Sequence, residues 1–116
     1  MFAAYLIVVM STLVVNAAAA AADFFRARFV LANSHEVGVP EGWLPLLGSL
    51  KAAGAAGLLI GLLWARPIGI AAAAGLVLFF VGAMVTHVRA RVLYNLAFPG
   101  FYLALAVGSL ILIAGR

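Results

Sequence analysis

The stretch GSLKAAGAAGLLIGL, residues 48–62, contains one ionisable side chain, Lys51, among small and aliphatic residues. A charged group at the centre of a membrane helix costs roughly 2.5–3.5 kcal/mol, so it marks a site whose partner must be found. Lys51 follows Trp43 by eight residues, and its stem is long enough to return the ammonium to the head groups. Three interpretations are open: a snorkelling or ion-paired lysine with Asp23 or Glu36 as partner, an ammonium that binds a quinone carbonyl or lipid phosphate, and a catalytic amine.

Other polar side chains recur near the ends of the apolar segments. His87 is interpreted either as a boundary histidine that donates to a helix carbonyl or as a hydrogen-bond donor or proton shuttle for a quinone. Asn16 is expected to join helices by hydrogen bonding. The candidate pocket residues are Asn16, Lys51, Thr86, His87 and Asn95, and the candidate rim residues are Asp23, His35, Glu36, Arg89 and Arg91.

The elements that must position these residues follow from composition. The 116-residue chain is 68% hydrophobic and 9% charged, which no soluble domain of this size could bury. Four apolar segments, residues 2–22, 44–64, 68–86 and 93–114, each approach the roughly 20 residues that a helix needs to cross the hydrocarbon layer. Because backbone groups in lipid must pair internally, we predict an all-α, four-helix transmembrane bundle, a single domain over residues 1–116 with a loop at 23–43.

Four spans place both termini on one side of the membrane, and the long loop and the basic link HVRARVLY at residues 87–94 on the other. Arg26, Arg28, Arg89 and Arg91 lie near the loop side, against Arg66 and Arg116 on the terminal side. The positive-inside rule therefore predicts loops in the cytoplasm and termini outside, in a bacterial cytoplasmic membrane. The candidate polar residues lie at matching depths on the loop side of the four spans. We therefore predict a one-sided polar pocket in that half of the bundle. We prefer a span to a cleaved signal peptide for residues 2–22, since no basic residue precedes the apolar run.

Small residues recur in the second and third apolar segments at spacings that place them on one helix face. Such faces let membrane helices approach closely, and the partner helix belongs either to the same chain or to another copy. A homo-oligomer or a larger membrane complex is therefore open. The predicted packing residues are Gly54, Gly57, Gly61, Gly75 and Gly82.

Several kinds of chemistry find no support in the sequence. The chain has no cysteine, two histidines and three carboxylates, so we expect no metal site. No nucleophile and base have motif-level spacing, and the catalytic residues, if any, are unknown. The net charge of +4 is spread along membrane boundaries, which favours lipid head groups over nucleic acid as partners. No cofactor is firmly implied; a quinone is the candidate.

Three stretches carry a resemblance: GVPEGWLPLLGSLKAAGAAGLLIGL, GIAAAAGLVLFFVGAMVTHVRAR and FPGFYLALAVGSLIL. They resemble the DoxX-like family of small bacterial four-span membrane proteins from about Gly38 to Leu112, with Lys51 in the second span and Thr86, His87 and Arg89 closing the third. The resemblance implies a subunit of a quinone-linked oxidoreductase, a membrane partner of soluble redox enzymes, or an assembly factor.

Three hypotheses of function follow. The first is an accessory membrane subunit that holds a quinone or a lipid in the one-sided pocket. The second is an enzyme that acts on a hydrophobic isoprenoid, quinone or lipid substrate, with Lys51 and His87 as acid and base. The third is a structural or assembly subunit that docks a larger complex through its glycine faces.

Overall fold

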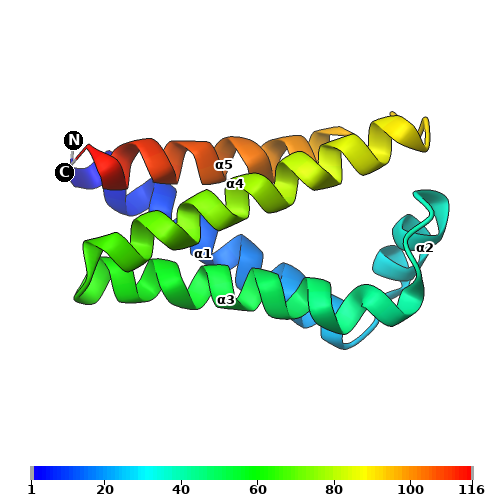
Figure 1. Ribbon diagram of the computed structural model, residues 1–116, viewed down its shortest axis with the longest axis horizontal. Helices are drawn as coiled ribbons and strands as arrows, with labels where there is room; N and C mark the ends of the chain where they lie inside the picture. The colour runs from blue at the N-terminus through cyan, green and yellow to red at the C-terminus, as the bar shows by residue number, and fades with distance from the viewer. Residues whose placement is uncertain (1, 116) are drawn as a thin grey trace.

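The structure, a computed structural model, describes residues 2–115, and the described residues form helices and no strand. Four of the helices are long and apolar enough to cross a membrane. Each packs against two neighbours, in the cyclic order α1, α3, α4, α5 (Figure 1). The predicted all-α membrane bundle is confirmed. The elements are α1 (Phe2–Phe24), α2 (Arg28–Glu36), the 3₁₀ turn η1 (Glu41–Trp43), α3 (Leu44–Leu63), α4 (Arg66–Arg89) and α5 (Ala97–Ala114).

Some helix ends differ from the expected spans. α3 and α4 each carry a proline in the first turn, where the missing N–H would have no intrahelical partner anyway. α4 continues to Arg89, so His87 lies on a helix and not in a link. α1 and α4 both end with a left-handed residue, Arg26 and Arg91, and the next amide donates to a carbonyl five residues back. This is the hydrogen bonding of a Schellman motif, which gives both helices a definite end.

The polarity of the bundle suits lipid as its solvent. Large apolar side chains face outward, with Leu78 73% exposed and Phe101 57% exposed, while Thr12, Asn16 and Ser109 are fully buried. A soluble domain would place its large apolar side chains inside. The interior combines small and aliphatic residues with a few hydrogen-bonded polar groups, which is the composition of membrane helix interfaces.

α1 crosses the bundle diagonally (Figure 1). Near its end it packs closely on α3, where a Cβ on Gly48 would lie 3.1 Å from the Asp23 Cβ atom. Near its start it packs on α5, where a Cβ on Gly108 would lie 3.3 Å from Val8 Cγ1. α1 and α3 therefore separate toward the end of the bundle at which α1 begins and α5 ends, which we call the terminal end.

The opposite end, the α2 end, is covered by α2 and η1 (Figure 1). Asn33 of α2 lies between α4 and the link to α5: its Oδ1 is 3.1 Å from His87 Nε2 and accepts from Asn95 Nδ2 at 3.1 Å. Tyr94 donates to Glu36 at 2.6 Å, and Arg26 forms an ion pair with Glu41 at 2.8 Å. The short helix is thus tied to the far side of the bundle by its own polar side chains, where the sequence predicted only a loop over residues 23–43.

Candidate functional site

A buried ion pair joins α1 to α3 below the α2 end. Lys51 Nζ lies 2.9 Å from Asp23 Oδ2, and the two side chains are only 15% and 4% exposed. Gly48, one turn before Lys51, lets the two helices approach closely enough for this contact. Of the interpretations open for Lys51, the structure shows the ion pair with Asp23.

The surroundings of this pair favour a cation beside Asp23. Asp23 is next to the last residue of α1, where the helix dipole disfavours a carboxylate, and the ammonium of Lys51 offsets that effect. Lys51 Nζ also lies 5.4 Å from the centre of the Phe79 ring, which adds a cation–π contact from α4. An ammonium has three N–H donors, so the bond to Asp23 leaves further donors on Lys51.

A second polar cluster joins α4, α2 and the link before α5. His87 Nδ1 lies 3.0 Å from the carbonyl oxygen of Ala83, one turn earlier on α4, and Nε2 faces Asn33. Each ring nitrogen of this buried histidine therefore faces an acceptor oxygen, and the neutral ring can donate to only one of the two at a time. Asn95 donates to the same Asn33 oxygen, but its own Oδ1 is buried without a hydrogen-bond partner among the described residues.

Asn16 stands apart from both clusters, on the interior face of α1. Its Nδ2 donates to the carbonyl oxygen of Thr12 at 2.9 Å, which fixes the orientation of the amide. Its Oδ1 is buried and has no partner among the described residues. Thr12 itself is fully satisfied, with Ser109 Oγ at 2.8 Å and the Leu105 carbonyl oxygen at 3.1 Å. Among residues 2–115, Asn16 therefore makes no hydrogen bond to another helix: its Nδ2 donates within α1 and its Oδ1 has no donor.

The remaining predicted residues lie at the surface of the α2 end. Thr86 donates to the Gly82 carbonyl oxygen on its own helix, and His35 and Arg89 are exposed. The five predicted pocket residues thus fall into separate hydrogen-bonded groups: Asn16 on α1, Lys51 with Asp23, Thr86 on α4 alone, and His87 with Asn95 through Asn33. Of the predicted rim residues, Asp23 is buried and not at the rim.

The predicted packing glycines divide into two groups. Gly54, Gly57 and Gly61 face α4: a Cβ on Gly61 would lie 2.4 Å from the Gly69 Cα atom, and one on Gly57 2.6 Å from the Ala72 Cβ atom. Gly75 and Gly82 are exposed, and an added Cβ would meet nothing within 4 Å. These two glycines take no part in packing within the chain, because α4 turns that face outward.

Sequence reasoning missed several residues that shape these clusters. Asn33 was not singled out, although it is an amide in a short stretch between aromatic and charged residues. Phe79, below Lys51, is indistinguishable by sequence from its lipid-facing neighbours. Gly48 precedes the glycines that were considered, and its heptad partner Ala55 is also buried. Asp23, by contrast, is one of the two partners that the sequence suggests for Lys51, and its seven-residue spacing from Asn16 places both on one face of α1.

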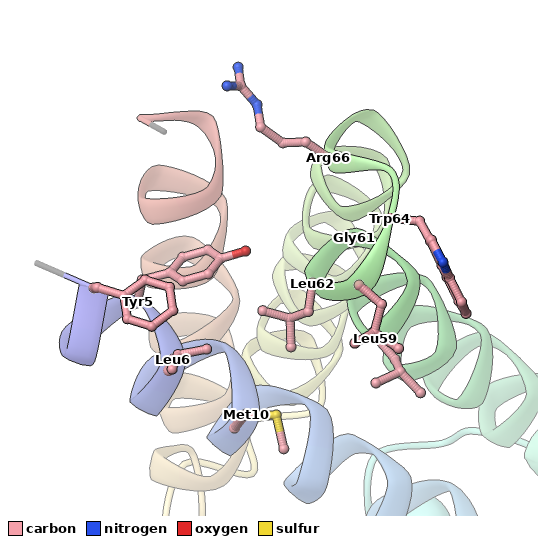
Figure 2. A pocket seen from close by; sticks show the side chains of 10 residues that line it. Tyr5, Leu6, Met10, Leu59, Gly61, Leu62, Trp64 and Arg66 are labelled. Atoms are coloured by element: carbon pink, nitrogen blue, oxygen red, sulfur yellow. The ribbon is translucent and has the colours of Figure 1, made fainter.

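A cavity lies elsewhere, at the terminal end. It is a groove of about 550 Å³ between α1 and α3, with Arg66 at its rim. Figure 2 shows Leu6, Met10 and Leu62 pointing into the space between the two helices. Sequence analysis placed its pocket in the other half of the bundle and did not predict this groove, which arises from the diagonal course of α1.

The comparisons with known proteins give one finding. The model of a family described as the DoxX-like family matches residues 7–109, which is most of the chain. No curated protein and no solved structure shows significant similarity to the chain.

Proposed function

Since this chain belongs to the DoxX-like family, and is an integral membrane protein, we propose that it is an accessory subunit that binds the polar head of a quinone or a lipid. The head would lie inside the bundle, between Asn16 and the ion pair of Asp23 with Lys51. The tail would extend between helices into the bilayer, which supplies the molecule without passage through water.

The observation that carries the proposal is the amide oxygen of Asn16. It is fully buried, its orientation is fixed by the Thr12 carbonyl oxygen, and it lacks a donor among the described residues. A buried polar atom without a partner costs about 1–3 kcal/mol, so such atoms call for an explanation. A hydroxyl group of a bound quinol or lipid would satisfy this oxygen.

Lys51 supplies the complementary chemistry. Asn16 and Asp23 lie two turns apart on the interior face of α1, a rise of about 10 Å, and Asp23 holds Lys51 beside it. The further N–H donors of the ammonium can reach a carbonyl or phosphate oxygen of a bound head group. The Asn16 oxygen can accept from a hydroxyl group, and the Lys51 ammonium can donate to a carbonyl oxygen. The two groups lie at different depths in the bundle, which suits the two ring oxygens of a quinone or quinol.

α2 supports binding in this half of the bundle. Its hydrogen bonds to α4 and to the link before α5 hold it over the end at which the α1 and α3 pair lies furthest from the α4 and α5 pair (Figure 1). A molecule held beneath it would be shielded from water, which strengthens polar contacts. Entry from the side, between helices, remains compatible with α2 staying in place.

Two facts favour binding over acid–base catalysis. Lys51 is neutralised by Asp23, and each ring nitrogen of His87 faces an oxygen of its own cluster. The two side chains belong to different clusters, and no hydrogen bond joins those clusters among the described residues. A general acid and base must be within hydrogen-bond reach of the same reacting group.

The setting that we propose is the bacterial cytoplasmic membrane with the α2 end facing the cytoplasm. Arg28, Arg89 and Arg91 are exposed at that end, as the positive-inside rule requires. In that orientation α2 and the basic residues would face soluble partners, and a quinone in the bundle would place the protein in a membrane redox complex.

The test is native mass spectrometry with lipid and quinone analysis on protein purified in mild detergent. Wild type should retain a defined quinone or lipid, and Asn16→Leu, which replaces the amide with an apolar side chain branched in the same way, should lose it. Ser109→Ala is the matched control, because Ser109 is equally buried but its hydroxyl already has a partner in Thr12. Equal occupancy in all three proteins, or none in wild type, would contradict the proposal.

A further inference from the structure

The groove at the terminal end is independent of the polar clusters described above. It opens between the first turns of α1 and the last turns of α3, and its walls include Leu6, Met10, Leu59 and Leu62. Its volume of about 550 Å³ lies within the range of about 300–1,000 Å³ that is typical of ligand sites.

The groove is a built feature of the bundle. At this end α3 is held to α4 through the contact of Gly61 with Gly69, and α1 is held to α5 through the contact of Val8 with Gly108. Both contacts draw α1 and α3 away from each other, and no side chain of α4 or α5 is among the apolar residues that line the space between them. Closing the groove would require breaking one of these two glycine contacts.

Charge at the mouth of the groove identifies the occupant. Arg66, the first residue of α4, is exposed at the rim and has no ion-pair partner among the described residues. The three side-chain carboxylates of the chain, Asp23, Glu36 and Glu41, all belong to elements of the α2 end. Trp64, also at the rim, is 79% exposed, as is usual for tryptophan at a membrane interface.

We propose that the groove binds one acyl chain of an anionic phospholipid whose phosphate contacts Arg66. Lipid tails are as apolar as the groove walls, so the chain gains no hydrophobic preference for the groove over the bilayer. Selection must come from the head group: the guanidinium fork of arginine matches any phosphate, but a zwitterionic head group carries its own cation, which offsets the attraction, and an anionic one does not. The site therefore discriminates by charge at the rim, while its apolar walls fix where the chain lies.

The test uses Trp64 as a fluorescent reporter in a Trp43→Phe background. The protein is reconstituted into vesicles of phosphatidylcholine with a minor fraction of phosphatidylglycerol, and the bromine quencher is carried on the acyl chains of equal amounts of either lipid. Because both vesicles have the same charge, only the identity of the lipid beside Trp64 differs. One arginine contact should enrich phosphatidylglycerol at the groove about fivefold over its bulk fraction, so quenching should be stronger when phosphatidylglycerol carries the bromine.

Matched variants separate a groove-bound lipid from a lipid merely attracted to a surface charge. Arg66→Gln should abolish the preference, and Arg89→Gln, which removes an exposed charge at the other end of α4, should leave it unchanged. Leu62→Phe and Met10→Phe fill the groove from opposite walls and retain Arg66, so either should also abolish it. Equal quenching in wild type, or a preference that survives both groove-filling variants, would overturn the proposal. None of these variants alters Asn16 or the ion pair of Asp23 with Lys51, so the test addresses the groove directly.

Discussion

At the scale of single residues, the bundle confines its charges to paired or exposed positions. The buried carboxylate of Asp23 and the ammonium of Lys51 neutralise each other at 2.9 Å. A buried charge without a partner is strongly destabilising, so each of the two residues offsets the cost of burying the other. The pair therefore behaves as one neutral unit with hydrogen-bonding capacity left over.

This arrangement predicts that single substitutions in the pair are far more harmful than the double one. Lys51→Met leaves Asp23 buried without a counter-charge and should lower the free energy of unfolding by about 3–5 kcal/mol. The double variant Lys51→Met with Asp23→Asn should recover most of that loss. Unfolding in mixed micelles checks both, and a single variant as stable as wild type would show that the pair is not a structural unit.

Tyr94 gives the protein a pH dependence at alkaline values. Its hydrogen bond to the Glu36 carboxylate raises the pKa of Tyr94 above the ordinary value of 10.0, with smaller contributions from desolvation and from the charge of Glu36. A raised folded-state pKa means that the contact stabilises the protein below pH 10, and the contribution is lost as pH rises through the folded-state pKa.

The expected result is therefore a stability difference between wild type and Tyr94→Phe at neutral pH that disappears in strong alkali. Absorbance titration of the phenols, compared between the two proteins, locates the ionisation of Tyr94. Tyr94 ionising at or below its ordinary pKa would show that the bond to Glu36 is not maintained in solution.

At the scale of elements, the packing of α3 on α4 depends on glycines that the sequence identifies by spacing. Gly54, Gly57 and Gly61 were predictable because close contact between membrane helices requires small residues at regular intervals. Gly75 and Gly82 have equally regular spacing and yet face outward, since spacing specifies a face but not which face meets a neighbour.

Gly61→Ala should therefore destabilise the bundle, because the new methyl group would lie 2.4 Å from the Gly69 Cα atom and force two backbones apart. We expect a loss of about 1–3 kcal/mol, as for other overpacked sites. Gly75→Ala is the control, since its methyl group would meet nothing within 4 Å. Thermal unfolding in detergent compares the two, and equal effects would contradict the assigned packing.

The limits of sequence reasoning are also clearest among the elements. The four spans follow from hydropathy, because lipid imposes length and apolarity on any helix that crosses it. The candidate site was less predictable: depth along each helix placed Asn16, Lys51 and His87 in one half of the bundle, but rotation about each axis decides their partners. Asn33, which binds His87, was missed because nothing in its local sequence reveals a contact with a residue 54 positions away.

At the scale of the whole molecule, α2 connects the two pairs of helices where they lie apart. Asn33 is the central contact, since one oxygen faces both His87 and Asn95. Asn33→Leu removes these bonds with a side chain branched in the same way and should release α2. The amides of α2 should then exchange faster with solvent, as measured by hydrogen exchange mass spectrometry.

The matched control is Asn16→Leu, an amide of the same type on α1 that makes no contact with α2 and should leave the exchange of α2 unchanged. Protection of α2 that is the same in Asn33→Leu and in wild type would show that its attachment depends on Tyr94 and Glu36 instead.

The diagonal course of α1 has a consequence for the protein as a whole. This helix is a neighbour of α3 at one end and of α5 at the other, with Thr12 bonded to Ser109 between them. A tilt of α1 about that contact changes the space at both ends together. Two molecules bound at opposite ends would then be thermodynamically linked. If the bound phospholipid changes the affinity of the inner site for its ligand by some factor, the bound inner ligand changes the affinity of the groove for the phospholipid by the same factor.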